Sequence, residues 1–188
     1  MMVLVRVFAV ILAACGLALS APLARADDAG PLERLVDTAA QRLETAYPVA
    51  AYKWVNGGSI EDPARVAQVL DTVGADASGR GIDAGYVRAA FENQIDATEG
   101  VEYILFGHWK FTPDAAPATA PDLTESRTAI DGFNKTMVAE MASQWGVLRG
   151  PGCSAELDAA KRAVATARGL DPLNVDALDV ATGSYCTT

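Results

Sequence analysis

Apolar residues recur every three or four positions along most of the chain, which is the spacing that places side chains on one face of an α-helix. The clearest segment begins after a capping Asp83 and runs to about Trp109. Its stripe consists of Val87, Phe91, Ile95, Thr98, Glu102 and Leu105. The pattern predicts a long amphipathic helix on which Thr98 and Glu102 share the apolar face.

Turn and capping residues divide the rest of the chain into further helices. Asp62-Pro63 and Asp171-Pro172 are start signals, because aspartate caps a helix and proline fits its first turn. Residues 112–121 lack periodicity and predict a loop. The other expected helices open at Pro31 (interrupted near Pro48, then Val49–Trp54), at Pro63, at about Leu123 (to Leu148), after a capping Ser154, and at Pro172 (to Tyr185 and Cys186). Because no segment shows convincing strand alternation, the predicted fold class is all-α, a single bundle-like domain of about six helices.

The first 26 residues have the features of an export signal. Arg6 supplies a positive start, residues 7–20 are almost wholly apolar, and Ala24-Arg25-Ala26 is a cleavage site. An alternative is a lipoprotein box ending at Cys15, which would leave that cysteine lipidated. The apolar run continues beyond Cys15 and a better cleavage site follows. We therefore predict a signal peptide over 1–26, cleavage after Ala26, and a secreted or periplasmic domain over 27–188 with no membrane attachment.

Cysteine count and charge narrow the function classes. Cleavage leaves Cys153 and Cys186, and two cysteines in an exported protein predict one disulfide. The whole chain has 24 acidic and 15 basic residues, a net charge of −9, and removal of Arg6 and Arg25 makes it more acidic. This balance argues against a nucleic acid or an anionic membrane as a partner.

Four cations lie beside or inside the apolar stripes: Arg42, Lys53, Arg65 and Arg127. A single one could extend its charged end to solvent, and Glu102 could pair with another. Several cations together, with too few nearby anions, instead predict an anionic ligand. Arg65 falls in the first turn of its helix, where a cation is favourable only if it and the free N–H groups face an anion. The sequence shows no metal-ligand cluster, Ser-His-Asp set or phosphate-binding glycine loop, so we predict neither a metal nor a cofactor.

The order of these residues resembles the all-helical chorismate mutases. The resemblance rests on Arg42, Lys53, Asp62-Pro63-Ala64-Arg65 and Thr98-x3-Glu102. The export signal, Arg127 within residues 126–131, and the cysteine pair resemble the secreted actinobacterial subclass, the exported gamma type. The resemblance covers essentially the whole mature chain.

The resemblance implies an isomerase that converts chorismate, a dicarboxylate, to prephenate in aromatic amino acid biosynthesis (the shikimate pathway). The reaction is a Claisen-type pericyclic rearrangement that needs no cofactor. The implied substrate-binding residues are Arg42, Lys53, Asp62, Arg65, Val69, Thr98, Glu102 and Arg127, with Lys53 and Glu102 as the catalytic pair at the ether oxygen. Val69 departs from the glutamine expected there. The resemblance also implies a homodimer.

Two points stay open at the level of sequence. The apolar stripe favours a neutral Glu102 whereas nearby cations favour its ionised form, so the charge of Glu102 is undecided. The alternative functions are an exported, disulfide-stapled helical binding protein that has lost catalysis, and a module that binds a carboxylate ligand. The complete set of cations favours the enzyme over both.

Overall fold

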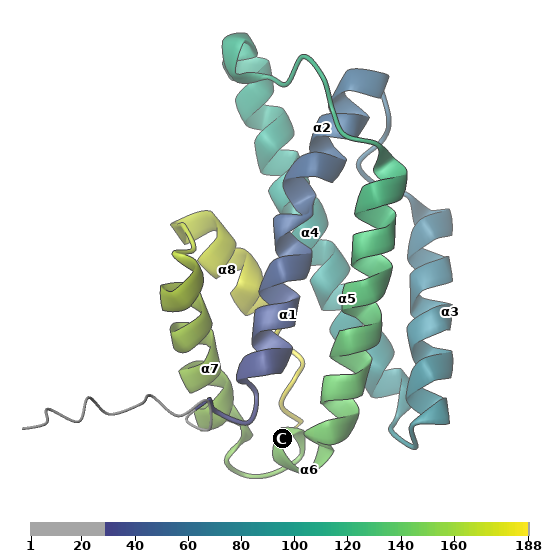
Figure 1. The fold of residues 1–188 in the computed structure, drawn as a ribbon, viewed down its shortest axis with the longest axis vertical. Helices are drawn as coiled ribbons and strands as arrows, with labels where there is room; N and C mark the ends of the chain where they lie inside the picture. Colours follow the sequence, from purple (N-terminus) through teal and green to yellow (C-terminus); the bar gives the residue numbers. More distant parts are fainter. Residues whose placement is uncertain (1–28, 188) are drawn as a thin grey trace, which may run out of the picture.

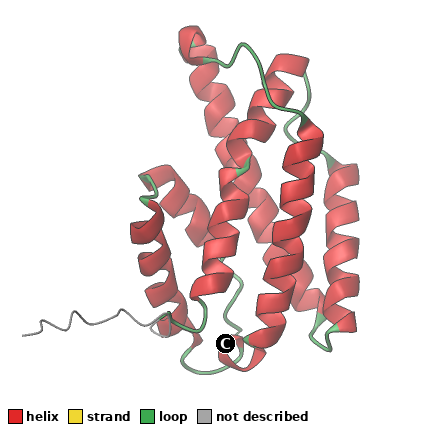
Figure 2. Cartoon of the chain, in the orientation of Figure 1, coloured by secondary structure: helices red, strands yellow, loops and turns green. Residues whose placement is uncertain are grey.

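The computed structural model describes residues 29–187, and within this range the chain forms helices and no strands (Figure 2). The helices are α1 (Glu33–Glu44), α2 (Ala46–Asn56), α3 (Pro63–Gly79), α4 (Ala84–Phe111), the short 3-10 helix η1 (Pro113–Ala115), α5 (Leu123–Ser143), α6 (Trp145–Leu148), α7 (Cys153–Arg168) and α8 (Pro172–Ala181). The all-α prediction is confirmed. The predicted export signal, its cleavage site and Cys15 lie outside the described residues.

Aspartate caps set the start of four helices. Asp62, Asp83 and Asp171 each accept a hydrogen bond from a backbone N–H three residues later, and Asp122 accepts from one two residues later. A side-chain cap of this kind contributes about 1 kcal/mol to stability. The helix starts predicted after Asp62, Asp83 and Asp171 are therefore confirmed, and each has the physical cause expected.

Two of the expected helices are each divided in two. The first breaks at Thr45, three residues before Pro48, because proline cannot donate to the carbonyl four residues earlier. The segment predicted from Leu123 to Leu148 breaks at Gln144, so that α6 is a separate turn. Trp145 there packs edge-on against Tyr86, with ring centroids 4.9 Å apart.

Two boundaries near the C-terminus differ from prediction. The N-cap of α7 is Gly152, so Ser154 lies inside the first turn and does not cap the helix. Helix α8 ends at Ala181, and Tyr185 and Cys186 lie in the following segment. That segment is held by tertiary contacts, because the Tyr86 hydroxyl donates to the carbonyl of Tyr185 over 2.6 Å.

The predicted disulfide between Cys153 and Cys186 is present, with Cα atoms 5.6 Å apart. It joins the start of α7 to the C-terminal segment across 33 residues. In the chain-entropy model, a loop of this length contributes roughly 3–4 kcal/mol to stability.

The helices form an elongated bundle with a smaller flank (Figure 1). Helix α4 runs the length of the molecule and packs against α2, α3 and α8, while α1 packs against α5 and α7. The α7–α8 hairpin covers one side of the lower half, and the centre contains fully buried Leu35, Phe91, Met137 and Tyr185. Among the described helices none is long and apolar enough to cross a membrane.

Candidate functional site

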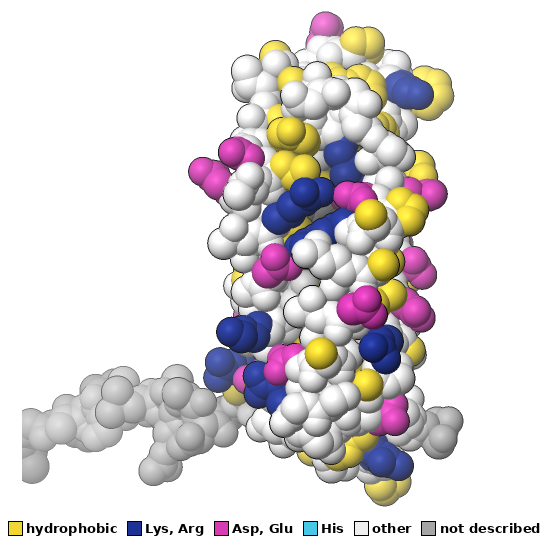
Figure 3. Space-filling model, turned by 90° about the vertical axis from the view of Figure 1, so that its right-hand side faces the viewer, with side chains coloured by type: hydrophobic (Ala, Val, Ile, Leu, Met, Phe, Trp, Pro, Cys, Tyr) yellow, Lys and Arg dark blue, Asp and Glu magenta, His cyan; other side chains and the backbone are white. Residues whose placement is uncertain are grey.

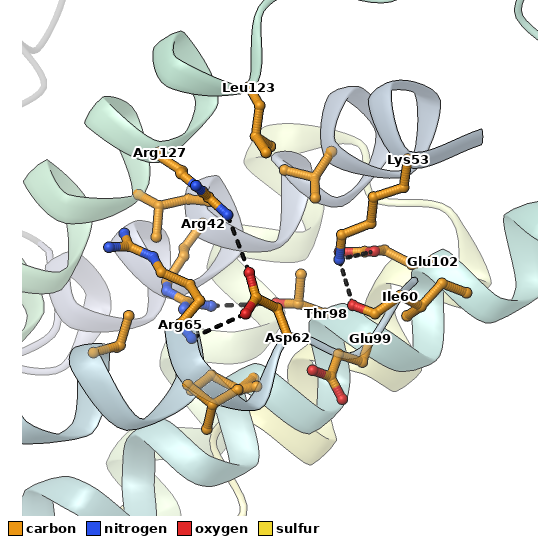
Figure 4. A pocket seen from close by; sticks show the side chains of 15 residues that line it. Arg42, Lys53, Ile60, Asp62, Arg65, Thr98, Glu99, Glu102, Leu123 and Arg127 are labelled. Carbon is orange, nitrogen blue, oxygen red and sulfur yellow. Dashed lines mark hydrogen bonds and ion pairs between the residues drawn. The ribbon is translucent and has the colours of Figure 1, made fainter. Parts of the chain in front are cut away.

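A pocket lies where α2, α3, α4 and α5 approach one another, away from the α7–α8 flank. Figure 3, seen from the side of α3 and α5, shows basic side chains gathered midway along this face. All eight residues that the sequence predicted for ligand binding line the pocket (Figure 4): Arg42, Lys53, Asp62, Arg65, Val69, Thr98, Glu102 and Arg127. They come from helices α1 to α5 and the N-cap of α3, so the tertiary fold assembles one cationic site.

Arg42 forms the floor of the pocket. The residue is 4% exposed. Its guanidinium donates to Asn134 Oδ1 over 2.7 Å, to Thr98 Oγ1 over 3.2 Å and to the Gln94 carbonyl over 3.5 Å. Burial lowers its pKa to about 10, which leaves it charged at neutral pH. All three acceptors are neutral, so the charge is oriented without being neutralised.

Lys53 and Glu102 form an ion pair on the opposite wall (Figure 4). Lys53 Nζ donates to Glu102 Oε2 over 2.8 Å and also to the carbonyl of Ile60. Ile60 reaches this position because Gly57 ends α2 with a positive φ of 72°, which glycine adopts without steric penalty. The turn after α2 therefore holds the ammonium at the pocket wall.

Glu102 is 2% exposed and has an ambiguous charge near neutral pH. Burial raises its pKa from 4.5 to about 7, and the Lys53 hydrogen bond and charge partly oppose this rise. A carboxyl group with such a pKa is present as both donor and acceptor at pH 7. The sequence left the charge of Glu102 undecided, and burial in the fold leaves the carboxyl group partly protonated near pH 7.

Arg65 and Arg127 occupy the more open side of the pocket. Arg65 pairs with Asp131 and donates to Gln68 Oε1 over 2.8 Å. Arg127 donates to Asp62 Oδ2 over 3.1 Å, and its side chain is 44% exposed. Although Arg127 is in register with an apolar stripe, it lies at the pocket rim and not in the core.

Asp62 links α3 to α5. Its Oδ1 caps α3 by accepting from the backbone N–H of Arg65 over 3.1 Å, while Oδ2 accepts from Arg127. One carboxylate therefore fixes the start of α3 and holds the Arg127 side chain beside the pocket.

Two smaller side chains complete the predicted set. Thr98 donates to the carbonyl of Gln94 over 2.8 Å while accepting from Arg42. Val69, 5% exposed, contributes an apolar wall. Valine has no polar side-chain atom and cannot hydrogen-bond to Glu102. Among the described residues, the Glu102 carboxyl group hydrogen-bonds to Lys53 alone.

Three residues in or beside the site were not predicted from the sequence. Asn134 lies seven residues after Arg127 and therefore on the same face of α5, and Gln94 lies four residues before Thr98 on the α4 stripe. Glu99 lines the pocket one turn before Glu102, and partial burial raises its pKa. Helical spacing could have identified Asn134 and Gln94, whereas Glu99 gave no signal beyond its position.

The charges favour a ligand with two negative groups. Four cations line the pocket, against Asp62, Glu99 and a Glu102 that is half protonated near pH 7. The arginines can bind carboxylates through paired donors. The Lys53–Glu102 pair can stabilise negative charge that develops on a ligand oxygen. Among residues 29–187, no group of three His, Cys, Asp or Glu side chains is placed to hold a metal ion.

The chain is similar to known chorismate mutases. A family model described as chorismate mutase type II matches residues 33–103, from the start of α1 into α4. A secreted chorismate mutase of Mycolicibacterium smegmatis is 58% identical over 165 residues, covering 88% of this chain and 91% of that protein. The secreted chorismate mutase of Mycobacterium tuberculosis is 49% identical over 168 residues, covering 89% and 84%.

A solved structure shows the same architecture. The crystal structure of chorismate mutase from Burkholderia phymatum superposes with a TM-score of 0.79 at 30% sequence identity. The match covers 84% of this chain and 97% of that one.

Proposed function

This chain belongs to the chorismate mutase type II family, and we propose that it acts as an exported enzyme converting chorismate to prephenate. The observation that supports this most strongly is the pocket itself, which combines three arginines with the Lys53–Glu102 pair. The high identity to two proteins named as secreted chorismate mutases supports both the reaction and the export.

The reaction requires positioning and charge stabilisation from the protein. Chorismate breaks its enol ether C–O bond while a C–C bond forms within the same molecule, so no nucleophile, metal or redox partner takes part. The protein must hold the compact reactive conformer and stabilise negative charge that develops on the ether oxygen. Even modest enzymatic acceleration needs about 8 kcal/mol of transition-state stabilisation.

We assign binding of the two carboxylates to the three arginines. Arg42 presents an uncompensated buried charge, whereas Arg65 and Arg127 are held by Asp131 and Asp62. A substrate carboxylate would compete with these aspartates for paired donors. Asp62 and Thr98 lie within the same wall and would orient the substrate by hydrogen bonds, with Val69 as an apolar contact.

We assign the bond-breaking step to Lys53 and Glu102. The ammonium is a permanent cation, and the protonated carboxyl group is a hydrogen-bond donor. Both groups are largely withdrawn from water, with side-chain exposures of 14% and 3%. In such a setting their interaction with a developing oxyanion is stronger than it would be in water.

Removal of the cations should abolish most activity. Purified mature protein should consume chorismate, and Lys53→Ala should lower kcat by about 10²–10³, the usual loss when one donor to a developing charge is removed. Arg127→Ala should mainly raise KM. Arg162→Ala, an exposed arginine on α7, is the matched control. Wild-type turnover equal to that of buffer would refute the enzymatic proposal.

The pH profile should report the protonation of Glu102. Because burial raises its pKa to about 7, kcat/KM should fall as pH rises through about 7, where the donor loses its proton. The fall in kcat should occur at higher pH, since bound dianion disfavours an ionised Glu102. Glu102→Gln donates at any pH and should flatten both profiles. Identical profiles for wild type and Glu102→Gln would exclude Glu102 as the titrating donor.

We propose that export removes residues 1–26. The mature protein should begin at Asp27 when its mass is measured after secretion, and Cys15→Ser should leave that mass unchanged. A lipid-modified fragment beginning at Cys15 would instead establish the lipoprotein alternative.

We also propose a homodimer, as the family resemblance implies. Helix α4 offers a surface for a second copy, because Tyr103, Ile104 and Phe111 are 52%, 53% and 92% exposed. Ile104→Asp should shift the wild-type dimer to monomer in sedimentation experiments. Val180→Asp, at a 51% exposed site on α8, is the matched control. A monomeric wild type at micromolar concentration would contradict the proposal.

A further inference from the structure

The three arginines of the pocket differ in how their charges are balanced. Arg65 pairs with Asp131 and Arg127 pairs with Asp62. Within residues 29–187, Arg42 has no carboxylate within ion-pair distance, although it is the most buried of the three. A buried charge without a counterion is unfavourable, and proteins keep one where a ligand supplies the missing charge.

The side chain that holds Arg42 is the amide of Asn134. Its Oδ1 accepts from Arg42 Nε over 2.7 Å, the shortest of the Arg42 hydrogen bonds, and Asn134 is 6% exposed. Nη1 is directed to Thr98 and the Gln94 carbonyl. Among the described residues no acceptor engages Nη2, so the guanidinium is fixed at two nitrogens and keeps a donor for a ligand.

Asn134 also lines a second cleft, which lies between α3 and α5. That cleft is lined by Asn134 together with Arg65 and Asp131, while Arg65 and Val69 line both spaces. Besides burial, three neighbouring groups act on the pKa of Arg42: Tyr185 and Asp131 raise it, whereas Arg65 lowers it. The neutral amide therefore decides whether Arg42 remains uncompensated.

We propose that Asn134 is a positioning residue, which orients Arg42 through Nε and, by being neutral, reserves the Arg42 charge for a substrate carboxylate. The proposal rests on the proposed function. An aspartate at this position would fit the same space and accept the same hydrogen bond. It would also supply the counterion that is missing. The free protein would therefore become more stable, and the substrate carboxylate would bind more weakly.

The test is to compare Asn134→Asp with the wild type in stability and kinetics. The free protein should become more stable, with Tm higher by about 2–4 °C, because a charge that is already buried acquires a partner. KM for chorismate should rise about tenfold or more, with a smaller change in kcat. A structural role alone would move stability and activity in the same direction. Asn174→Asp, on α8 and remote from the pocket, makes the same charge change and should leave KM unaltered.

Asn134→Leu removes the acceptor while keeping similar volume, and it covers the case in which the aspartate variant does not fold. Arg42 should then lose its orientation, and kcat/KM should fall about tenfold or more. The proposal is overturned if folded Asn134→Asp keeps KM within twofold of wild type, or if folded Asn134→Leu keeps kcat/KM within twofold of wild type. Prephenate binding by titration calorimetry separates the two proposals. A wild type that neither turns over chorismate nor binds prephenate refutes the function, whereas an active wild type with unaffected variants refutes only the role of Asn134.

Discussion

The central constraint on this structure is the burial of a guanidinium charge between helices that otherwise pack through apolar side chains. Arg42 is only 4% exposed, on a helix whose other inward residues include aliphatic side chains such as Leu35 and Leu43. Its position is tolerable because α4 and α5 both present neutral acceptors to it. The bundle must keep these helices in register to satisfy those bonds, so the geometry of the fold and that of the pocket are determined together.

The same burial determines the chemistry on the opposite wall. Glu102 lies on the face of α4 that also contains Ile95 and Thr98. Its withdrawal from water raises its pKa, while Lys53 opposes the rise. Burial outweighs the effect of Lys53, and the resulting pKa of about 7 leaves an acid able to donate near neutral pH. Arg65 and Arg127, at the open side, keep aspartate partners and lie closer to solvent. The pocket thus combines a buried interior with a rim that is more exposed to solvent.

Much of this arrangement could be predicted from local sequence patterns. Capping aspartates fixed three helix starts, and the cysteine count predicted the disulfide between Cys153 and Cys186. Helix ends were less predictable, since the break at Thr45 comes from a proline three residues later and the end of α8 depends on tertiary contacts of Tyr185. Asn134 was missed although its helical spacing places it on the same face as Arg127, because an asparagine shows no chemical role until its partner is known.

The sequence by itself determined the all-helical class, because periodicity and capping are properties of neighbouring residues. For the same reason it showed that charged residues lie on the apolar faces of separate helices. By resemblance to a known family it also identified eight of the residues that line the pocket. Tertiary structure decided which charges are compensated, because pairing depends on distances between helices. Only in the folded chain do Asp131 and Asp62 reach Arg65 and Arg127 while Arg42 receives a neutral amide. The degree of burial, which sets the charge of Glu102, is likewise a property of the packed helices and of no single segment.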